Sequence, residues 1–167
     1  MLRKLKIAKI STDYCEYLRK YDNKVSYNKG KKELRPFVGI LFTINNCEYF
    51  APLSSPKEKH LKMNNTIDFL KIDNGKLGAV NFNNMIPVHS NNYKIIKLYD
   101  KDNLILDKKY QHLLLEQYTW LNENYIQIKN KSCFLYKSYI NKKLSEHIKS
   151  RCCDFPLLEA KSKEYNK

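Results

Sequence analysis

Residues 36–57 read PFVGILFTINNCEYFAPLSSPK, in which two runs rich in aromatic and β-branched residues flank the short polar turn Asn45-Asn46-Cys47. Aromatic and β-branched residues favour strands, and a short turn containing Asn between two such runs favours an antiparallel hairpin. We therefore predict that this stretch forms the first hairpin of an antiparallel sheet.

The β pattern continues as far as residue 98. Two further strands are predicted over residues 66–72 and 77–82, joined by Asp73-Asn74-Gly75-Lys76. An Asn-Gly step between β-rich runs is a strong hairpin signal. Shorter strands are expected over residues 85–88 and 93–98. The region 36–98 is thus predicted to hold a twisted antiparallel sheet of about six strands.

Helical patterns lie on both sides of this region. Tyrosines recur at helical spacing over residues 11–22, where Ser11 or Asp13 can provide the N-cap. Residues 23–35 are polar and basic and predict a mobile loop. A C-terminal helical region is expected over residues 100–150, with an apolar stripe over 106–128, a second helix over 132–148, and a short tail, 151–167. This pattern predicts one α+β domain, 1–167, with helices flanking the sheet.

The charge of the chain is strongly positive. Its 167 residues include 31 Lys and Arg against 17 Asp and Glu, which gives a formal charge of +14. Such an excess favours polyanionic partners, nucleic acid first among them, although basic proteins with other roles share it. No apolar run is long enough for a signal peptide or a membrane span. We therefore expect a cytoplasmic protein with no membrane partner.

The sequence lacks the motifs of several classes of enzyme. The four histidines are scattered, neither H-x-x-x-H nor H-E-x-x-H occurs, and the five cysteines include no C-x-x-C pair. The sequence also lacks G-x-S-x-G, P-loop and G-x-G-x-x-G motifs. We expect reduced thiols, no metal site and no cofactor.

One segment can carry chemistry. Pro52 and Pro56 bracket Ser54 and Ser55 at the end of the predicted hairpin, and Lys57 follows directly. The prolines restrict the backbone, so two hydroxyls and a cation are held near one another. A serine turn that merely closes the strand is the competing interpretation. The residues alone therefore nominate this site without establishing it.

The same segment carries a resemblance to a known family. Residues 36–57, LGAVNFNNMIPV (77–88), CDFPLLE (153–159) and STDYCEYLRKYDNKV (11–25) are similar to the ToxN/AbiQ family of type III toxin endoribonucleases. These segments occur in the same order as in the family, and together they span most of the chain. Its most specific parts are the hairpin with its PL-[ST]-S-P-K turn and the G-x-x-N-x-x-x-M-I-P block.

The resemblance implies both a fold and an activity. The implied fold is a compact, barrel-like sheet related to the Kid/MazF toxins. The implied activity is metal-independent cleavage of cellular or phage mRNA that leaves a 2′,3′-cyclic phosphate, as part of abortive phage infection. The implied inhibitor is a small structured, pseudoknot-like antitoxin RNA, which the toxin processes from a repeat precursor and with which it alternates in a closed ring.

The resemblance also implies the site residues. The family's Thr-Ser pair and following lysine fall on Ser54, Ser55 and Lys57, and its basic residue before the first strand falls on Arg35. Ser54 stands where relatives often have threonine, which keeps the hydroxyl. Arg35 stands where some members have lysine. Because arginine stays protonated, any proton transfer performed by that lysine must pass to another residue here.

A further set is expected to contact RNA. Exposed tyrosines can stack on unpaired bases and lysines can contact phosphates, although helical tyrosines also serve as core residues. The runner-up function, a non-enzymatic RNA-binding module, would use this set without needing Ser55 or Lys57. The expected RNA-binding residues are Tyr14, Tyr27, Lys29, Lys31 and Lys32.

Overall fold

The structure is a computed structural model that describes residues 5–27, 35–99 and 107–166. Its centre is an antiparallel sheet of eight strands. The strands are β1 (Lys6–Ile10), β2 (Phe37–Gly39), β3 (Thr43–Ile44), β4 (Cys47–Ser54), β5 (Phe69–Lys71), β6 (Ala79–Asn81), β7 (Ile86–Val88) and β8 (Tyr93–Ile95). The helices are α1 (Thr12–Arg19), α2 (Glu58–Lys62), α3 (Lys108–Glu123), α4 (Tyr125–Ile140), α5 (Glu146–Lys149) and α6 (Phe155–Tyr165).

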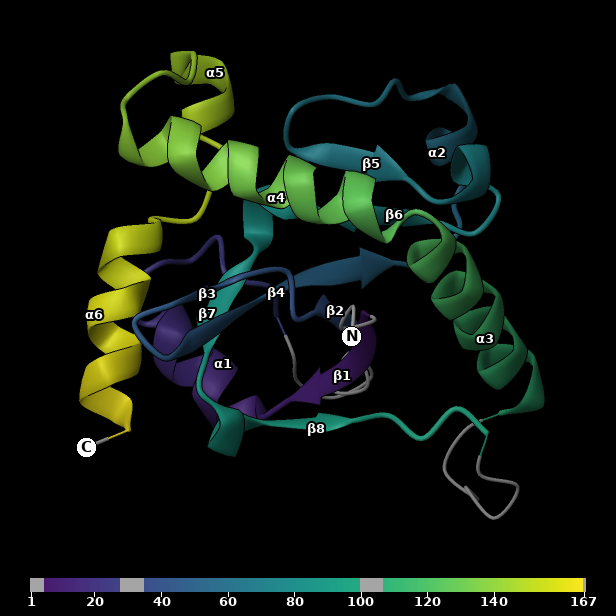
Figure 1. Ribbon diagram of the computed structural model, residues 1–167, viewed down its shortest axis with the longest axis horizontal. Helices are drawn as coiled ribbons and strands as arrows, with labels where there is room; N and C mark the ends of the chain where they lie inside the picture. Colours follow the sequence, from purple (N-terminus) through teal and green to yellow (C-terminus); the bar gives the residue numbers. More distant parts are fainter. Residues whose placement is uncertain (1–4, 28–34, 100–106, 167) are drawn as a thin grey trace.

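The sheet is organised around β4. The main strand order is β5-β6-β4-β2-β1-β8, and β3 and β7 also pair with β4. The first half of β4 pairs with β3 and β7, and its second half pairs with β2 and β6. The predicted hairpin over residues 36–57 is thereby confirmed, and it lies in the middle of the molecule (Figure 1).

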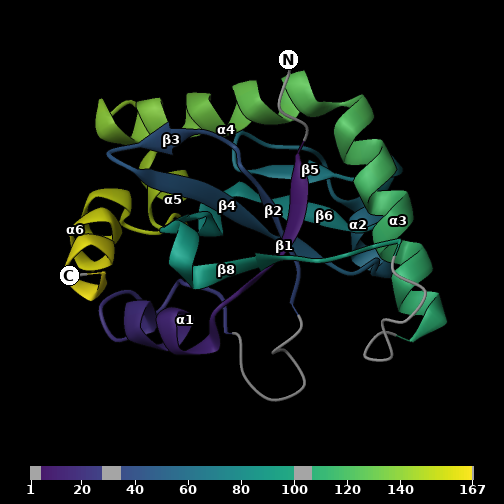
Figure 2. The same cartoon turned by 60° about the horizontal axis from the view of Figure 1, so that its bottom comes forward.

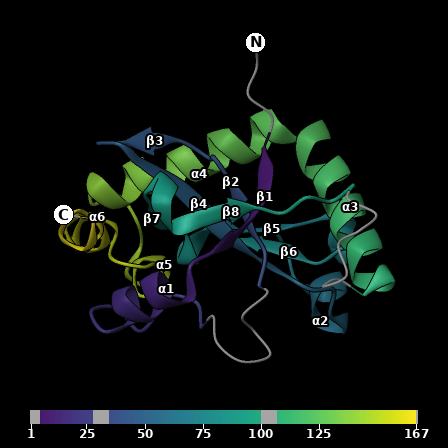
Figure 3. The same cartoon turned by 90° about the horizontal axis from the view of Figure 1, so that it is seen from below.

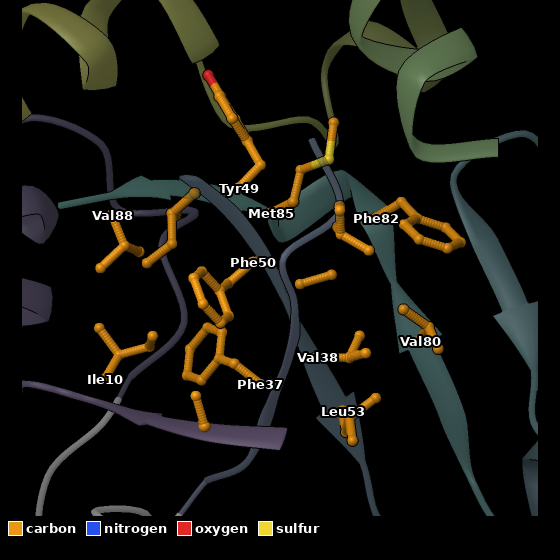
Figure 4. Packing of buried hydrophobic residues seen from close by; sticks show 14 of the residues in the cluster. Ile10, Phe37, Val38, Tyr49, Phe50, Leu53, Val80, Phe82, Met85 and Val88 are labelled. Atoms are coloured by element: carbon orange, nitrogen blue, oxygen red, sulfur yellow. The ribbon is translucent and has the colours of Figure 1, made fainter. Parts of the chain in front are cut away.

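Both faces of β4 are buried. Phe50 points toward Phe37 on one face, whereas Tyr49 points to the other (Figure 4). On that second face, the Tyr49 ring lies 5.4 Å from the Tyr136 ring, and its hydroxyl donates to Glu159 Oε1 at 2.5 Å. Because apolar or aromatic residues are needed on both faces, β4 lacks the simple apolar-polar alternation of a half-exposed strand.

The longer helices surround the sheet. In Figure 2, α4 runs along one side, α3 and α6 flank the two ends, and α1 lies on the side opposite α4. Seen from below, β1 lies between β2 and β8 (Figure 3), in agreement with the strand pairing. No helix of the described residues is long and apolar enough to cross a membrane.

The α+β class is confirmed, and the barrel-like expectation is wrong. The sheet is not closed, because its end strands β5 and β8 do not pair with each other in the part of the chain that the structure describes. The hairpin of β5 and β6 is confirmed, with Leu70 opposite Val80. Its turn contains the short 3-10 helix η2 (Asp73–Gly75), where Asn74 has a φ of 54°.

One central strand was not predicted. β1 pairs with β2 on one edge and with β8 on the other, so the sheet also includes residues outside 36–98. Ile7 and Ile10 are buried, while Lys6 is exposed. A lysine-rich segment of five residues has too little length for its alternation to predict a strand, and long-range pairing supplies the remaining stabilisation.

The predicted helix bounds after residue 100 are also wrong. The apolar stripe is divided at Asn124, which ends α3 and precedes α4, and α4 itself ends at Ile140. The buried residues Leu114, Leu121, Ile128 and Leu135 lie seven residues apart across the break. Since the period continues through Asn124, periodicity cannot reveal where one helix ends and the next begins.

The predicted tail is a structured part of the molecule. Asp154 Oδ1 accepts a hydrogen bond from Leu157 N–H at 3.2 Å and caps α6, and Pro156 lies in the first turn. Pro in a first turn is favourable because its missing N–H would have no helical partner. Phe155 and Leu158 are fully buried in the core. The C-terminal residues therefore form a core helix.

We expect Leu158→Ala to lower the free energy of unfolding by about 2–5 kcal/mol, because a fully buried side chain is replaced by a cavity. Urea denaturation measures this change. Lys163→Ala on the exposed side of the same helix is the matched control and should shift stability by no more than about 0.5 kcal/mol. Equal effects of the two substitutions would show that α6 does not pack as described.

Candidate active site

The two candidate serines lie where β4 ends. Ser54 is the last residue of β4 and pairs with Ala79 of β6. On the other edge, Phe37 pairs with Pro52, and Leu53 N–H donates to the carbonyl of Pro36 at 2.9 Å. Arg35 directly precedes Pro36 and Ser54 directly follows Leu53, so the two residues lie at the adjoining ends of the paired segments of β2 and β4.

Ser54 is held from two directions. Asn81 Nδ2 donates to Ser54 Oγ at 2.7 Å. The backbone of Gly78 packs so closely that a Cβ on this residue would lie 1.9 Å from the carbonyl oxygen of Ser54. Gly78 also has a φ of 98°, in the left-handed region that favours glycine. Both contacts come from the G-x-x-N block, which explains its link to the serine turn.

The next residues form an exposed turn into α2. Ser55 and Lys57 are exposed, and Lys57 is the N-cap residue of α2. Its backbone N–H donates to His60 Nδ1 at 3.2 Å. His60 is only 2% exposed, and its carbonyl lies against Gly75, where a Cβ would approach to 2.5 Å. The buried imidazole thus fixes the backbone from which the Lys57 side chain extends.

The His60 ring is kept neutral by its surroundings. Burial lowers its pKa, and the charges of Lys59 and Lys57 lower it further. Because Nδ1 accepts a hydrogen bond, the single ring proton of the neutral form lies on Nε2. Protonation would place a second donor against the Lys57 N–H and remove this contact.

The cations of the site have no acidic partners within the part of the chain that the structure describes. Among the described residues, no carboxylate lies within ion-pair distance of Arg35 or Lys57, whereas Lys62 pairs with Glu58 at 3.5 Å and Arg151 with Asp68 at 2.8 Å. Arg35 is partly buried, and loss of hydration lowers its pKa. A guanidinium with no counter-ion among the described residues is suited to bind a phosphate group.

Tyr27 is exposed in the segment that follows α1. Its side chain is 42% exposed, and the Arg19 guanidinium carbon lies 5.4 Å from its ring centroid. Arg19 also donates to the carbonyl of Val25, which ties the segment after α1 to that helix. The ring is therefore supported from one side. Lys29, Lys31 and Lys32 lie outside the described residues.

Tyr14 corrects the expected RNA-binding set. Its side chain is fully buried, and its hydroxyl donates to the carbonyl of Pro87 at 2.5 Å. The ring packs edge-on against Tyr165 of α6, with 5.2 Å between the centroids. A base cannot stack on a ring in this position. The competing interpretation of Tyr14 as a core residue is the correct one.

Sequence reasoning assigned no role to Asn81 or His60. Asn81 is the asparagine of the G-x-x-N block, but no local sequence pattern indicates that it forms a hydrogen bond with Ser54. His60 follows Lys57 by three residues, which is capping-box spacing.

No group of three or more potential metal ligands occurs in the described ranges. A groove of about 840 Å³ between the Asn45-Asn46 turn and α6 lies near the other end of β4.

Comparison with known proteins gives the chain a family context. Residues 6–163 match the sequence profile of the family described as toxin ToxN, type III toxin-antitoxin system. Endoribonuclease ToxN of Bacillus thuringiensis subsp. kurstaki is 38% identical over 164 residues, which cover 96% of this chain and 84% of that protein.

Two solved structures have the same fold. One comes from a type III toxin-antitoxin system in which a non-coding RNA pseudoknot selectively inhibits the toxin. It is 35% identical, with a TM-score of 0.84 and coverage of 99% of both chains. The other is AbiQ, a lactococcal anti-phage endoribonuclease of a type III system. It is 26% identical, with a TM-score of 0.84, and covers 98% of this chain and 99% of that chain.

The neutral state of His60 predicts a pH dependence of stability. Its lowered pKa means that, below its ordinary value of about 6.5, the unfolded chain binds a proton that the folded chain resists. The free energy of unfolding should therefore fall as pH decreases through the window below about 6.5. Thermal melting between pH 5 and pH 7.5 measures this dependence.

His60→Gln should flatten the dependence in this window, because the Gln amide oxygen can accept the same hydrogen bond without titrating. His112→Gln is the control, since the His112 side chain is 74% exposed on α3. An unchanged pH profile in the His60 variant would contradict the assignment.

Proposed function

Because the chain belongs to the ToxN family of type III toxin-antitoxin systems, we propose that it is a metal-independent endoribonuclease that cleaves cellular or phage mRNA. The observation that carries this proposal is the run of two hydroxyls and a cation at the end of β4, Ser54, Ser55 and Lys57, for which the described residues provide no ion-paired carboxylate. The active site comprises Ser54, Ser55, Lys57 and Arg35.

The reaction needs no group from outside the RNA except a proton acceptor and a proton donor. The 2′-oxygen attacks the adjacent phosphorus in line and loses its proton, while the bond to the 5′-oxygen breaks. The products are a 2′,3′-cyclic phosphate and a 5′-hydroxyl that takes up a proton. Extra negative charge develops on the non-bridging phosphoryl oxygens during this step, so fixed cations and hydroxyl donors accelerate it.

Each side chain has a defined part in this scheme. Lys57 and Arg35 stabilise the charge on the phosphoryl oxygens. Ser55, exposed on the turn, donates a hydrogen bond that positions the scissile phosphate, and Ser54 supports it from the end of β4. Arg35 acts as a permanent cation that can bind phosphate in a bidentate manner, and takes no part in proton transfer.

RNA reaches this site past the segment that follows α1. Tyr27, with Arg19 packed on one side of its ring, stacks on an unpaired base. Lys29, Lys31 and Lys32 contact phosphates of the same strand, as their sequence position predicts. A formal charge of +14 adds a long-range attraction that brings RNA to the surface.

The proposed inhibitor is a small structured, pseudoknot-like RNA. One relative in this fold is inhibited by a non-coding RNA pseudoknot, and another is an anti-phage endoribonuclease. By analogy, this toxin processes a repeat precursor into RNA units that cover the site at Ser55 and Arg35, and it acts in abortive phage infection. If two faces of the toxin contact different RNA units, the contacts are heterologous and can close into a ring.

We expect Ser55→Ala to abolish RNA cleavage and toxicity while it changes the free energy of unfolding by less than about 1 kcal/mol, because Ser55 is an exposed residue. The assay incubates the purified protein with a long RNA in EDTA and follows fragment formation. Ser90→Ala, at another exposed serine, is the matched control.

The outcomes of this assay separate the candidate functions. Cleavage by the wild type in EDTA, lost in the Ser55 variant, supports the proposed enzyme. A shifted but intact RNA with the wild type would identify a binding module instead. Full cleavage by the Ser55 variant would reject the assigned site.

The ring assembly predicts a definite composition. Co-expression of the protein with the repeats encoded directly upstream of its gene should yield a complex that contains several toxin chains and an equal number of RNA units. Native mass spectrometry measures the copy numbers. A protein-only dimer, or a complex with a protein inhibitor and no RNA, would be incompatible with the proposal.

A further inference from the structure

We propose that Asn81 is a positioning residue for RNA cleavage, whose amide holds Ser54 Oγ so that the Ser54 hydroxyl proton points to a phosphoryl oxygen of the substrate. This inference rests on the proposed function, because it assumes that a phosphate occupies the site. It also gives Ser54 a direct contact with substrate in addition to its support of Ser55.

Sheet geometry brings Asn81 to Ser54. β4 and β6 pair with Leu53 opposite Val80 and Ser54 opposite Ala79. Side chains two residues apart on a strand share a face, so Asn81 is the diagonal neighbour of Ser54 on the face of Ala79. Its Nδ2 reaches Ser54 Oγ at 2.7 Å, a short distance for this type of hydrogen bond.

The backbone around this contact leaves little freedom. Gly78, three residues before Asn81, lies against the carbonyl oxygen of Ser54. The carbonyl oxygen of Gly78 in turn accepts the N–H of Ile72 at 2.9 Å, which anchors it to the end of β5. Asn81 is therefore presented to Ser54 by paired strands rather than by a loop, and the contact is preorganised before RNA binds.

The direction of the hydrogen bond determines what Ser54 can do. An amide nitrogen can only donate, so Ser54 Oγ accepts from Asn81 and keeps its own proton for another acceptor. In the described part of the chain, no acceptor within hydrogen-bond distance receives this proton. A phosphoryl oxygen is such an acceptor. A donor that itself receives a hydrogen bond is also polarised and donates more strongly.

Asn81→Asp tests this direction because the side chain keeps its size and loses its N–H groups. The new carboxylate would accept the Ser54 proton and withdraw it from the substrate. We expect the cleavage rate at saturating RNA, measured in EDTA, to fall about tenfold or more, with less than about a threefold change in KM. Asn130→Asp adds the same charge on the exposed side of α4 and should leave both constants unchanged.

A double-mutant cycle separates positioning from general support of the fold. If Asn81 acts only through Ser54, Asn81→Ala should lower the rate in the wild-type background and have no further effect in the Ser54→Ala background. Thermal melting of all four proteins accompanies the kinetics. An equal fold-loss from Asn81→Ala in both backgrounds would overturn the inference, as would wild-type rates in both Asn81 variants.

The same experiment distinguishes a failure of the proposed function from a failure of the role assigned to Asn81. If the wild type leaves RNA intact in EDTA, the proposed function fails and this inference fails with it. If the wild type cleaves RNA and the Asn81 variants cleave equally well, only the role of Asn81 is rejected.

Discussion

The antiparallel pairing of β4 is the constraint on which the rest of the structure depends. This strand pairs with β2, β3, β6 and β7, and both of its faces are buried. Its first half lies under α6, where Tyr49 binds Glu159, and its last residue is Ser54. One continuous strand thus connects the packed interior to the candidate site. The position of Ser54 is therefore set by β4, the strand with the most pairing partners in the sheet.

The candidate site combines a rigid base with exposed chemical groups. β6 holds Ser54 through Asn81 and Gly78, and buried His60 holds the backbone of Lys57. Ser55 and Lys57 remain exposed at the surface. Such a division is favourable for catalysis by positioning, because little ordering is left to occur when RNA binds. Within residues 5–27, 35–99 and 107–166, no carboxylate pairs with Arg35 or Lys57, so none of these residues neutralises their charge.

Family membership and site geometry are two different kinds of observation on this chain. The family match extends over residues 6–163 and concerns the whole fold. The candidate site comprises a few side chains at the end of β4 and on the adjoining turn. The pairing of β2 with β4 sets the positions of the chain segments that lead to Arg35 and to Ser54.

Sequence by itself determined the features that short segments encode. The hairpin of residues 36–57, the β5–β6 turn and the first helix follow from local alternation, turn residues and capping, because these depend on neighbours along the chain. Only the tertiary structure decided the central place of β1, the helix break at Asn124, the burial of Tyr14 and the contact of Asn81 with Ser54. Each of these joins residues far apart in sequence or depends on which face another element covers. The hydrophobic period of a short segment does not carry that information, because a distant partner stabilises the segment only when the two are packed together.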